Sequence, residues 1–209
     1  MYSFDLHVHT VCSGDSPCTV REALESAKKK GLNGLAITDH NSVSALSEGK
    51  KVAKEMDLMF IPGIEVSSKD GHILGLGVEE SIPRELDAAE TVDRIREKGG
   101  IAVSAHPFSL SPKPFSAIRA DYDAIEVFNP RRFIGNQLAR KYAAEKDLPT
   151  VAGSDSHYKE EIGLAGIKVD GPLDLDSIIG KIKKGETSLF GHHLPISGYL
   201  RRVLFRMSI

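Results

Sequence analysis

Short apolar runs alternate with helical patterns along most of this chain, and this alternation limits the folds that it can adopt. After an opening strand, strand-like runs lie at residues 35–37, 59–61, 73–76, 101–103, 124–127 and 150–152. Helical periodicity covers about residues 20–27, 43–56, 88–98 and 136–146. Alternating strands and helices predict a parallel sheet. About seven strand–helix units fit this length, so we expect an α/β fold, a compact and distorted (β/α)7 TIM-like barrel.

The first predicted helix carries a signal at each end. Thr19 and Glu22 have the spacing of a capping box, in which each side chain pairs with the backbone of the other residue. Gly31 follows the last turn and supplies the stop. These residues predict where the helix begins and ends.

The bulk properties fit one soluble globular domain. The chain has 209 residues, of which 41% are hydrophobic, and a net charge of −2. We expect a single domain over residues 1–209, with a C-terminal helical extension at about 195–209. No apolar run approaches the roughly 18 residues that span a bilayer, and the N-terminus lacks the pattern of a signal peptide. We therefore expect a cytoplasmic protein with no membrane contact.

The tripeptide His7-Val8-His9 ends the opening strand. Side chains two residues apart share one face of a strand, so both imidazoles would lie on the same side. Such a pair is an ordinary beginning of a metal site. A similar arrangement returns at Asp155 and His157. We expect the chain to close around a metal that these two segments share.

Six of the eight histidines lie at the ends or starts of predicted strands, and a barrel would bring these positions to one rim. Burying six imidazoles without a metal or another partner would be costly. The six histidines are His7, His9, His40, His72, His106 and His157. The other two, His192 and His193, could line the rim of the site, but we expect a plain loop pair.

Several acidic residues accompany the histidines. Glu65 directly follows an apolar run and needs a partner if it is buried. Asp15 follows His9 by six residues and is either a ligand or a turn residue. Asp39 can also be a ligand, but we expect it, like Asp5, to orient an imidazole from behind.

Together these motifs, in their order and spacing, resemble the PHP (polymerase and histidinol phosphatase) family over about residues 3–160. The resemblance implies a distorted seven-stranded barrel with three divalent metal ions. It assigns the ligands of the first ion as His7, His9, Glu65 and Asp155. Glu65 would bridge to a second ion held by His72 and His106. Asp15, His40 and His157 would hold the third.

Closely spaced metal ions suit the hydrolysis of phosphate esters, because they make bound water acidic and offset charge on both sides of phosphorus. We expect a metal-bound hydroxide near Glu65 to attack, with Glu65, Asp155 and His106 as catalytic residues. Mixed histidine and carboxylate ligands favour Zn, Mn or Fe. Arg131 and Arg132 follow a predicted strand and are the expected phosphate-binding residues.

The expected substrate is a small phosphorylated metabolite or nucleotide, with an oligonucleotide end as the second choice and no obligate protein partner. Amidohydrolase barrels also open with a His-x-His strand, so C–N bond hydrolysis is an alternative. A metal-binding module without catalysis is another. Arg201, Arg202 and Arg206 are expected on a packed C-terminal helix, as a solvated basic face or a partner surface.

Two remaining features have local interpretations. Cys12 and Cys18 do not form a Cys-x-x-Cys pair, and we expect reduced loop or packing residues, with a metal or redox role as the alternative. Residues 109–114 contain two prolines without periodicity and predict a loop over the mouth of the barrel.

Overall fold

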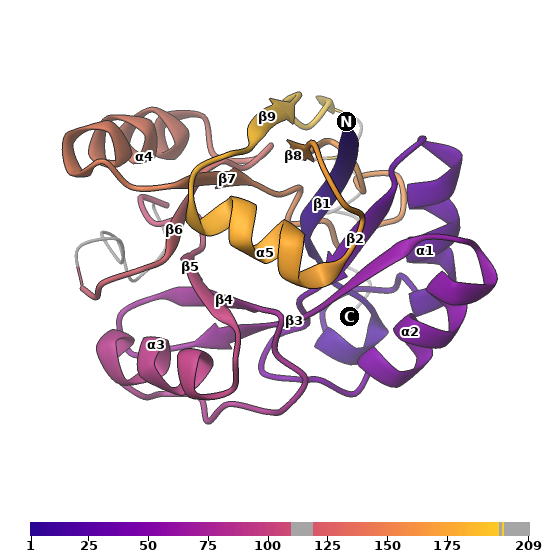
Figure 1. Ribbon diagram of the computed structural model, residues 1–209, viewed down its shortest axis with the longest axis horizontal. Coiled ribbons are helices and arrows are strands. Elements are labelled where there is room, and N and C mark those ends of the chain that lie inside the picture. Colours follow the sequence, from indigo (N-terminus) through magenta and orange to yellow (C-terminus); the bar gives the residue numbers. More distant parts are fainter. Residues whose placement is uncertain (110–118, 197, 199–209) are drawn as a thin grey trace.

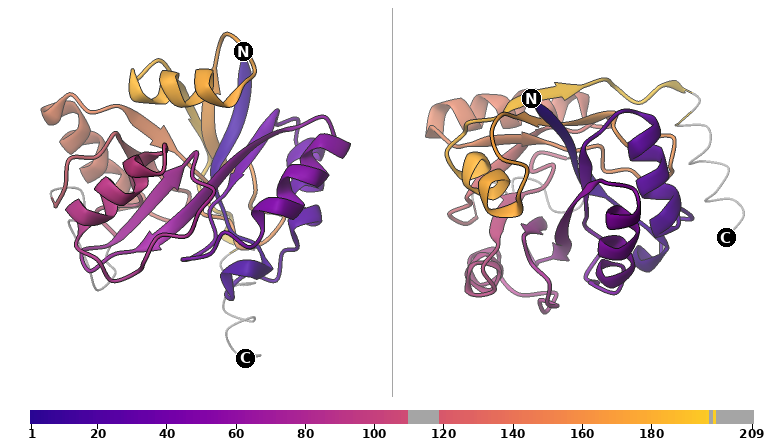
Figure 2. Two further views of the ribbon diagram at one scale, coloured as in Figure 1. Left: turned by 60° about the horizontal axis from the view of Figure 1, so that its bottom comes forward. Right: turned by 45° about the vertical axis from the view of Figure 1, so that its right-hand side comes forward.

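A computed structural model describes residues 1–109, 119–196 and 198 of the chain, and within them nine strands form one sheet. The sheet order is β7-β6-β5-β4-β3-β2-β1-β8-β9. The strands are β1 (Tyr2–Val8), β2 (Gly34–Ile37), β3 (Met59–Ser67), β4 (His72–Leu76), β5 (Ile101–Ser104), β6 (Ala124–Phe128), β7 (Thr150–Ala152), β8 (Ala165–Val169) and β9 (Ser188–Gly191). The sheet curls into a barrel whose strands are visible between the flanking helices (Figure 2).

The barrel closes where the segment after β7 returns to β1. Ser156 forms a parallel bridge with Val8, and its carbonyl accepts a hydrogen bond from the amide of His9 at 2.9 Å. At the other end of β1, residues Tyr2, Ser3 and Phe4 pair with antiparallel β8 instead. The first seven strands therefore make a distorted barrel that is joined at one mouth and parted by β8 at the other, which confirms the predicted fold class.

In the described ranges, five α-helices lie outside or across the sheet: α1 (Val20–Lys29), α2 (Leu46–Glu55), α3 (Ala88–Glu97), α4 (Phe133–Lys146) and α5 (Leu175–Lys183). Helices α1 and α2 share a core with β2 and β3, α3 packs on β3 and β4, and α4 packs on β6. Helix α5 lies across one mouth of the barrel (Figure 1), where Ile178 and Ile182 join the core inside it. The mouth of the barrel opposite α5 is not covered by this helix and can hold a functional site.

The predicted all-parallel sheet is wrong in part. Strand β4 is antiparallel to both β3 and β5, and β8 is antiparallel to both β1 and β9. Only residues 68–71 separate β3 from β4, and a parallel crossover needs a dozen or more residues, so the chain turns back directly. As a result, the first residue of β4, His72, lies opposite Ser67 at the end of β3. A histidine at the start of a strand thus reaches the same mouth as residues at strand ends.

Some predictions fall on residues outside the described ranges. They are the loop over the mouth beyond Ser109, most of the helical extension at 195–209, and the basic residues Arg201, Arg202 and Arg206. In the described part of the chain, no helix has the length and hydrophobicity needed to cross a membrane.

Replacing Thr19 with alanine is expected to lower the free energy of unfolding by about 1 kcal/mol. The Thr19 hydroxyl accepts from the amide of Glu22 at 3.2 Å, and the Glu22 carboxylate accepts from the amide of Thr19 at 3.1 Å, as the capping box predicted. Denaturant unfolding measures the loss. Thr19→Ser keeps the acceptor and is the matched control, so an equal loss in both variants would contradict this role of the cap.

Candidate metal centre

The nine residues predicted as metal ligands all lie at the mouth opposite α5. They come from seven segments of the chain: His7 and His9 at the end of β1, Asp15 after a short 3-10 helix (Val11–Ser13), His40 after β2, Glu65 and His72 in β3 and β4, His106 after β5, and Asp155 and His157 after β7. Their imidazoles form a continuous group, with neighbouring ring centroids 4.4–6.3 Å apart. Strand ends from the whole barrel therefore converge as the sequence indicated.

Glu65 lies at the centre of the group and is fully buried. Its Oε2 lies 3.3 Å from His7 Nε2, 3.2 Å from His9 Nε2 and 3.0 Å from His40 Nδ1. Its other oxygen, Oε1, lies 2.9 Å from His72 Nδ1 and 3.2 Å from His106 Nε2. The two oxygens thus face different sets of imidazoles, which is the arrangement that a bridging carboxylate needs.

Four buried atoms at this point have no hydrogen-bond partner among the described residues: His7 Nε2, His9 Nε2, His40 Nδ1 and Glu65 Oε2. Buried polar atoms without a hydrogen bond are costly, and here the three imidazole nitrogens all lie within 3.3 Å of the Glu65 oxygen. A divalent metal bound about 2.0–2.2 Å from such atoms places neighbouring ligands about 3 Å apart. The residues therefore fit a metal ion, since the observed separations from Glu65 Oε2 are 3.0–3.3 Å.

A second group lies at the exposed edge of the cluster. Asp15 Oδ2 lies 2.9 Å from His157 Nε2 and 3.5 Å from His40 Nε2. With His9, these residues offer four ligand atoms within 4.8 Å of one another. The Asp15 side chain is 48% exposed, so this part of the centre opens to solvent.

Asp155 joins a third group with His7 and His106. Its carboxylate lies 3.5 Å from His9 Nε2, and it also contacts the guanidinium of Arg131. Arg131 donates a second hydrogen bond to the Asp155 carbonyl at 2.8 Å. The groups therefore overlap: His7 belongs both to the group with Asp155 and to the group with Glu65, and His9 belongs both to the group with Glu65 and to the group with Asp15.

Arg131 and Arg132 line a cavity of about 200 Å³. The lining includes Phe108, Ser109 and the first residues of α4. Arg131 reaches from this cavity to Asp155, and Arg132 lines the same cavity.

Charge is unevenly distributed over the cluster. Burial by itself would raise the pKa of Glu65, but neighbouring imidazoles, His7 foremost, hold it well below its ordinary value. Burial opposes a charge on His7, yet the carboxylates of Glu65 and Glu126 outweigh it and raise the pKa of His7 to about 10. The buried carboxylates therefore favour positive charge at the centre, which protons or metal cations can supply.

Three other imidazoles remain neutral near pH 7, whereas the carboxylates of Glu65 and Asp15 outweigh burial at His40 and raise its pKa to about 10. Burial lowers the pKa of His9 and of His106 to about 4, and that of His157 to about 3. A neutral imidazole is the form that binds metals. These three side chains are thus ready to act as ligands without losing a proton.

Asp5 and Asp39 were predicted to hydrogen-bond to imidazole rings, and this prediction is wrong. Asp39 accepts from the amide and hydroxyl of Thr10, at 2.5 and 2.7 Å, rather than from an imidazole. Asp5 accepts from the amides of His7, Ser154 and Gly163. Both carboxylates therefore fix the backbone beside the ligands instead of orienting a ring.

Two residues of the centre have backbone conformations that L-residues rarely adopt. His106 has φ of 29° and Asp155 has φ of 50°. Such conformations cost energy and persist where the surroundings hold them. The amide of His106 donates to Glu126 at 2.9 Å, and the Asp155 carboxylate accepts from Asn129 at 3.1 Å.

Sequence reasoning missed Glu126, Asn129 and Ser13. Ser13 Oγ accepts from the amide of His40 at 3.0 Å and lies 3.1 Å from His9 Nδ1. Glu126 carried a usable signal, because it interrupts the apolar strand Ala124–Phe128 as Glu65 interrupts its own. The other two residues lie in loops or strand ends, where sequence alone gives no such contrast.

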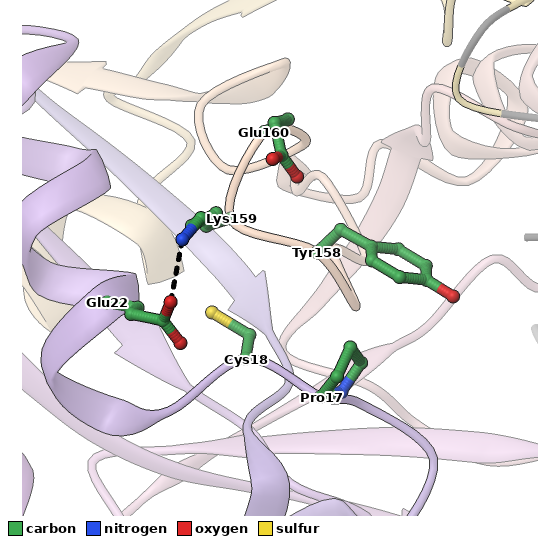
Figure 3. Close-up of a pocket in the computed structure, with 6 residues that line it drawn as sticks. All are labelled: Pro17, Cys18, Glu22, Tyr158, Lys159 and Glu160. Carbon is green, nitrogen blue, oxygen red and sulfur yellow. Dashed lines mark hydrogen bonds and ion pairs between the residues drawn. The ribbon is translucent and has the colours of Figure 1, made fainter. Parts of the chain in front are cut away.

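The remaining histidines and the cysteines lie apart from these groups. His192 and His193 are exposed, as expected of a loop pair. Cys12 and Cys18 are free, and Cys18 lines a separate cavity of about 240 Å³ beside the Glu22–Lys159 ion pair (Figure 3). Burial raises the pKa of Cys18 to about 12, so its thiol is a packing group rather than a nucleophile.

Known proteins similar to this chain include phosphatases. A family model described as PHP-associated matches residues 133–187. An uncharacterised protein of Methanocaldococcus jannaschii is 38% identical over 162 residues, which cover 71% of this chain and 94% of that protein. A probable phosphatase of Proteus mirabilis is 52% identical over 204 residues, which cover 78% of this chain and 82% of that protein. A 3',5'-nucleoside bisphosphate phosphatase of Chromobacterium violaceum is 35% identical over 101 residues, which cover 46% of this chain and 34% of that protein.

Solved structures show the same fold. A two-domain protein from Bacteroides vulgatus, which contains a predicted PHP-like metal-dependent phosphoesterase, superposes with a TM-score of 0.76. The match covers 98% of this chain and 69% of that one, at 18% identity. The fold is therefore shared with a protein of low sequence identity.

Proposed function

The chain belongs to the PHP family of metal-dependent phosphoesterases, and on that premise we propose that it hydrolyses small phosphomonoesters at a site for three divalent ions. The single observation that carries the proposal is the meeting of His7 Nε2, His9 Nε2, His40 Nδ1 and Glu65 Oε2. The atoms are buried. His7, His9 and Glu65 have the mutual spacing of ligands of one ion, while His40, whose Nδ1 lies 3.0 Å from the same Glu65 oxygen, also groups with Asp15 and His157.

The three ions would be held by overlapping sets of the nine residues. His7, His9, Glu65 and Asp155 would hold the first, Glu65, His72 and His106 the second, and Asp15, His40 and His157 the third. Mixed nitrogen and oxygen donors suit Zn, Mn or Fe. When bound, such ions make a water acidic enough to act as a nucleophile and offset the charge of phosphate oxygens.

The protein's own residues would prepare the site in distinct ways. Glu65 presents one oxygen to each of two sets of imidazoles and so would hold the two sets of ligands at a fixed separation. Asp155 holds Arg131 through its carboxylate and its carbonyl, which keeps the guanidinium beside the ligands. His106 stays uncharged, because burial lowers its pKa to about 4. We propose that Glu65, Asp155 and His106 are the residues nearest the reacting phosphate.

The size of the adjoining cavity and its charge support a small ester as the substrate. The cavity beside Asp155 measures about 200 Å³ and contains both Arg131 and Arg132. A planar guanidinium pairs well with phosphate oxygens. The Chromobacterium violaceum relative is named for a nucleoside bisphosphate, which supports including nucleotides among the candidates. An oligonucleotide end is the second candidate.

Replacing Arg131 with alanine is expected to raise the KM for a phosphomonoester by about 10- to 100-fold, since a charge-assisted hydrogen bond contributes roughly 1.5–3 kcal/mol. Arg131→Lys keeps the charge without the planar fork and should lie between wild type and alanine. Steady-state kinetics measure both variants. Arg21→Ala removes an exposed arginine that pairs with Glu55 on the outer helices, and it is the matched control. Unchanged kinetics in Arg131→Ala would contradict substrate binding by this residue.

A substrate panel tests the proposed reaction. The metal-loaded protein should release phosphate from nucleoside monophosphates, sugar phosphates or histidinol phosphate, and should act less on short oligonucleotides. Cyclic amides belong in the same panel because amidohydrolase barrels share the opening motif. Turnover of the amides alone, or of no ester at all by metal-loaded protein, would overturn the proposal.

A further inference from the structure

Glu126 is a buried carboxylate that lies next to the metal centre without belonging to it. It is in β6, and only 2% of its surface is exposed. Among the described residues, it is absent from every group of side chains with metal-compatible spacing. A charge buried at this depth needs strong partners.

Its partners are all tied to candidate ligands. His7 Nδ1 lies 3.0 Å from Glu126 Oε1, while the amide of His106 donates to Glu126 Oε2 at 2.9 Å. The side-chain amide of Asn129 also donates to Oε2, at 3.4 Å, and to the Asp155 carboxylate at 3.1 Å. One carboxylate thus connects ligands that come from three different strands.

The chemistry of these donors determines where the His7 proton lies. An ionised carboxylate only accepts hydrogen bonds, and its Oε2 accepts from the His106 amide and from the NH2 group of Asn129. Oε1 is then left to accept from His7, which places the proton on Nδ1. In the form that binds a metal ion, the lone pair is then on His7 Nε2, the nitrogen that lies 3.3 Å from Glu65 Oε2.

The local packing is built for this contact. Gly153 lies against both partners: a Cβ at this position would come within 2.4 Å of His7 Cβ and 3.0 Å of Glu126 Oε1. Glycine therefore lets the strand carrying Glu126 approach β1 closely enough for the hydrogen bond.

We propose that Glu126 is a positioning residue that fixes His7 in its Nδ1–H form and anchors the backbone of His106. This inference rests on the proposed function, since it assigns His7 Nε2 to a metal ion. The carboxylate acts through the ligands and does not touch the substrate.

Glu126→Gln tests the proposal with almost no change in size. The amide oxygen can serve His106 and Asn129, but its NH2 group then faces His7 Nδ1 and demands an acceptor there. The His7 proton should move to Nε2, which removes the lone pair that binds the metal. We expect the affinity for one zinc ion to fall about 10- to 100-fold, as is typical when a partner behind a ligand is lost.

The readouts are zinc affinity by calorimetry and the histidine tautomer by NMR of zinc-loaded, ¹⁵N-labelled protein. Wild type should show a hydrogen-bonded Nδ1 proton on His7, and Glu126→Gln should lose it. Asp123→Asn is the matched control, because Asp123 is a largely buried carboxylate that accepts from the backbone amide of Ala102 and pairs with Arg96, neither of which is a candidate ligand. That control should keep the His7 signal and the zinc affinity.

A His7 proton on Nε2 in wild-type protein would overturn the proposal even if Glu126→Gln did not fold. Equal loss of zinc in Glu126→Gln and Asp123→Asn would also overturn it, because the cause would then be loss of a buried charge alone. Failure of the wild type to bind zinc or release phosphate would instead count against the proposed function. The two failures are therefore distinguishable.

Discussion

Replacing both His7 and His9 with alanine is expected to remove most of the bound metal and to abolish phosphate release. These imidazoles supply two of the four unpaired buried atoms around Glu65 Oε2. His7 also belongs to the group with Asp155, and His9 to the group with Asp15. Among the described residues, the double variant thus removes side chains from three of the four groups with metal-compatible spacing and leaves only that of His40, Glu65 and His72 intact. Metal analysis after dialysis, together with a phosphate-release assay, measures both losses.

The matched control removes two histidines from outside the centre. His192 and His193 are adjacent and exposed, so their double alanine variant deletes the same chemistry without touching the cluster. It should keep wild-type metal content and the kcat of the wild type. Full metal and full activity in the His7 and His9 variant would show that the cluster is not the active site.

Glu65→Gln is expected to have the second-largest effect, a loss of at least two of three bound ions. Both Glu65 oxygens lie 2.9–3.3 Å from imidazole nitrogens, and five histidines share this one charge. A neutral amide offers a single oxygen and turns its NH2 group toward nitrogens that should bind metal. Metal per chain, measured after dialysis against excess zinc or manganese, is the readout.

Asp15→Asn is the variant to compare with Glu65→Gln, because it removes a ligand of only one proposed ion. Asp15 is half exposed and contacts only His157 and His40 among the candidate ligands. Its loss should cost one ion and leave two, with activity reduced but still measurable. If the two variants lost the same number of ions, Glu65 would not be a bridge between separate ligand sets.

The sequence predicted the barrel because its apolar runs and helical stretches alternate clearly. It did not predict the reversal of β4, since an antiparallel hairpin and a parallel unit contain the same apolar run. The short connection at residues 68–71 was the available signal. The segment from β8 to β9, where β8 displaces β7 from the start of β1, carries no marker that distinguishes it from another strand–helix unit.

The positions of the candidate ligands were predictable for a physical reason. A histidine at a strand end must lie at a mouth of the barrel, whatever the loops do. The partners behind the ligands depend instead on exact backbone paths, which is why Asp39 was assigned to His40 but contacts Thr10. Glu126 shows the intermediate case, because its charge within an apolar strand was visible while its contact with His7 was not.

Titration of metal-free protein with manganese or zinc, while phosphate release from a small phosphomonoester is followed, tests the central claim most directly. The proposed centre predicts no release without metal, a rise as ions are added, and a maximum near three ions per chain. Protein that binds three ions and releases no phosphate from any ester in the panel would contradict the claim. So would full activity in protein shown to contain no metal.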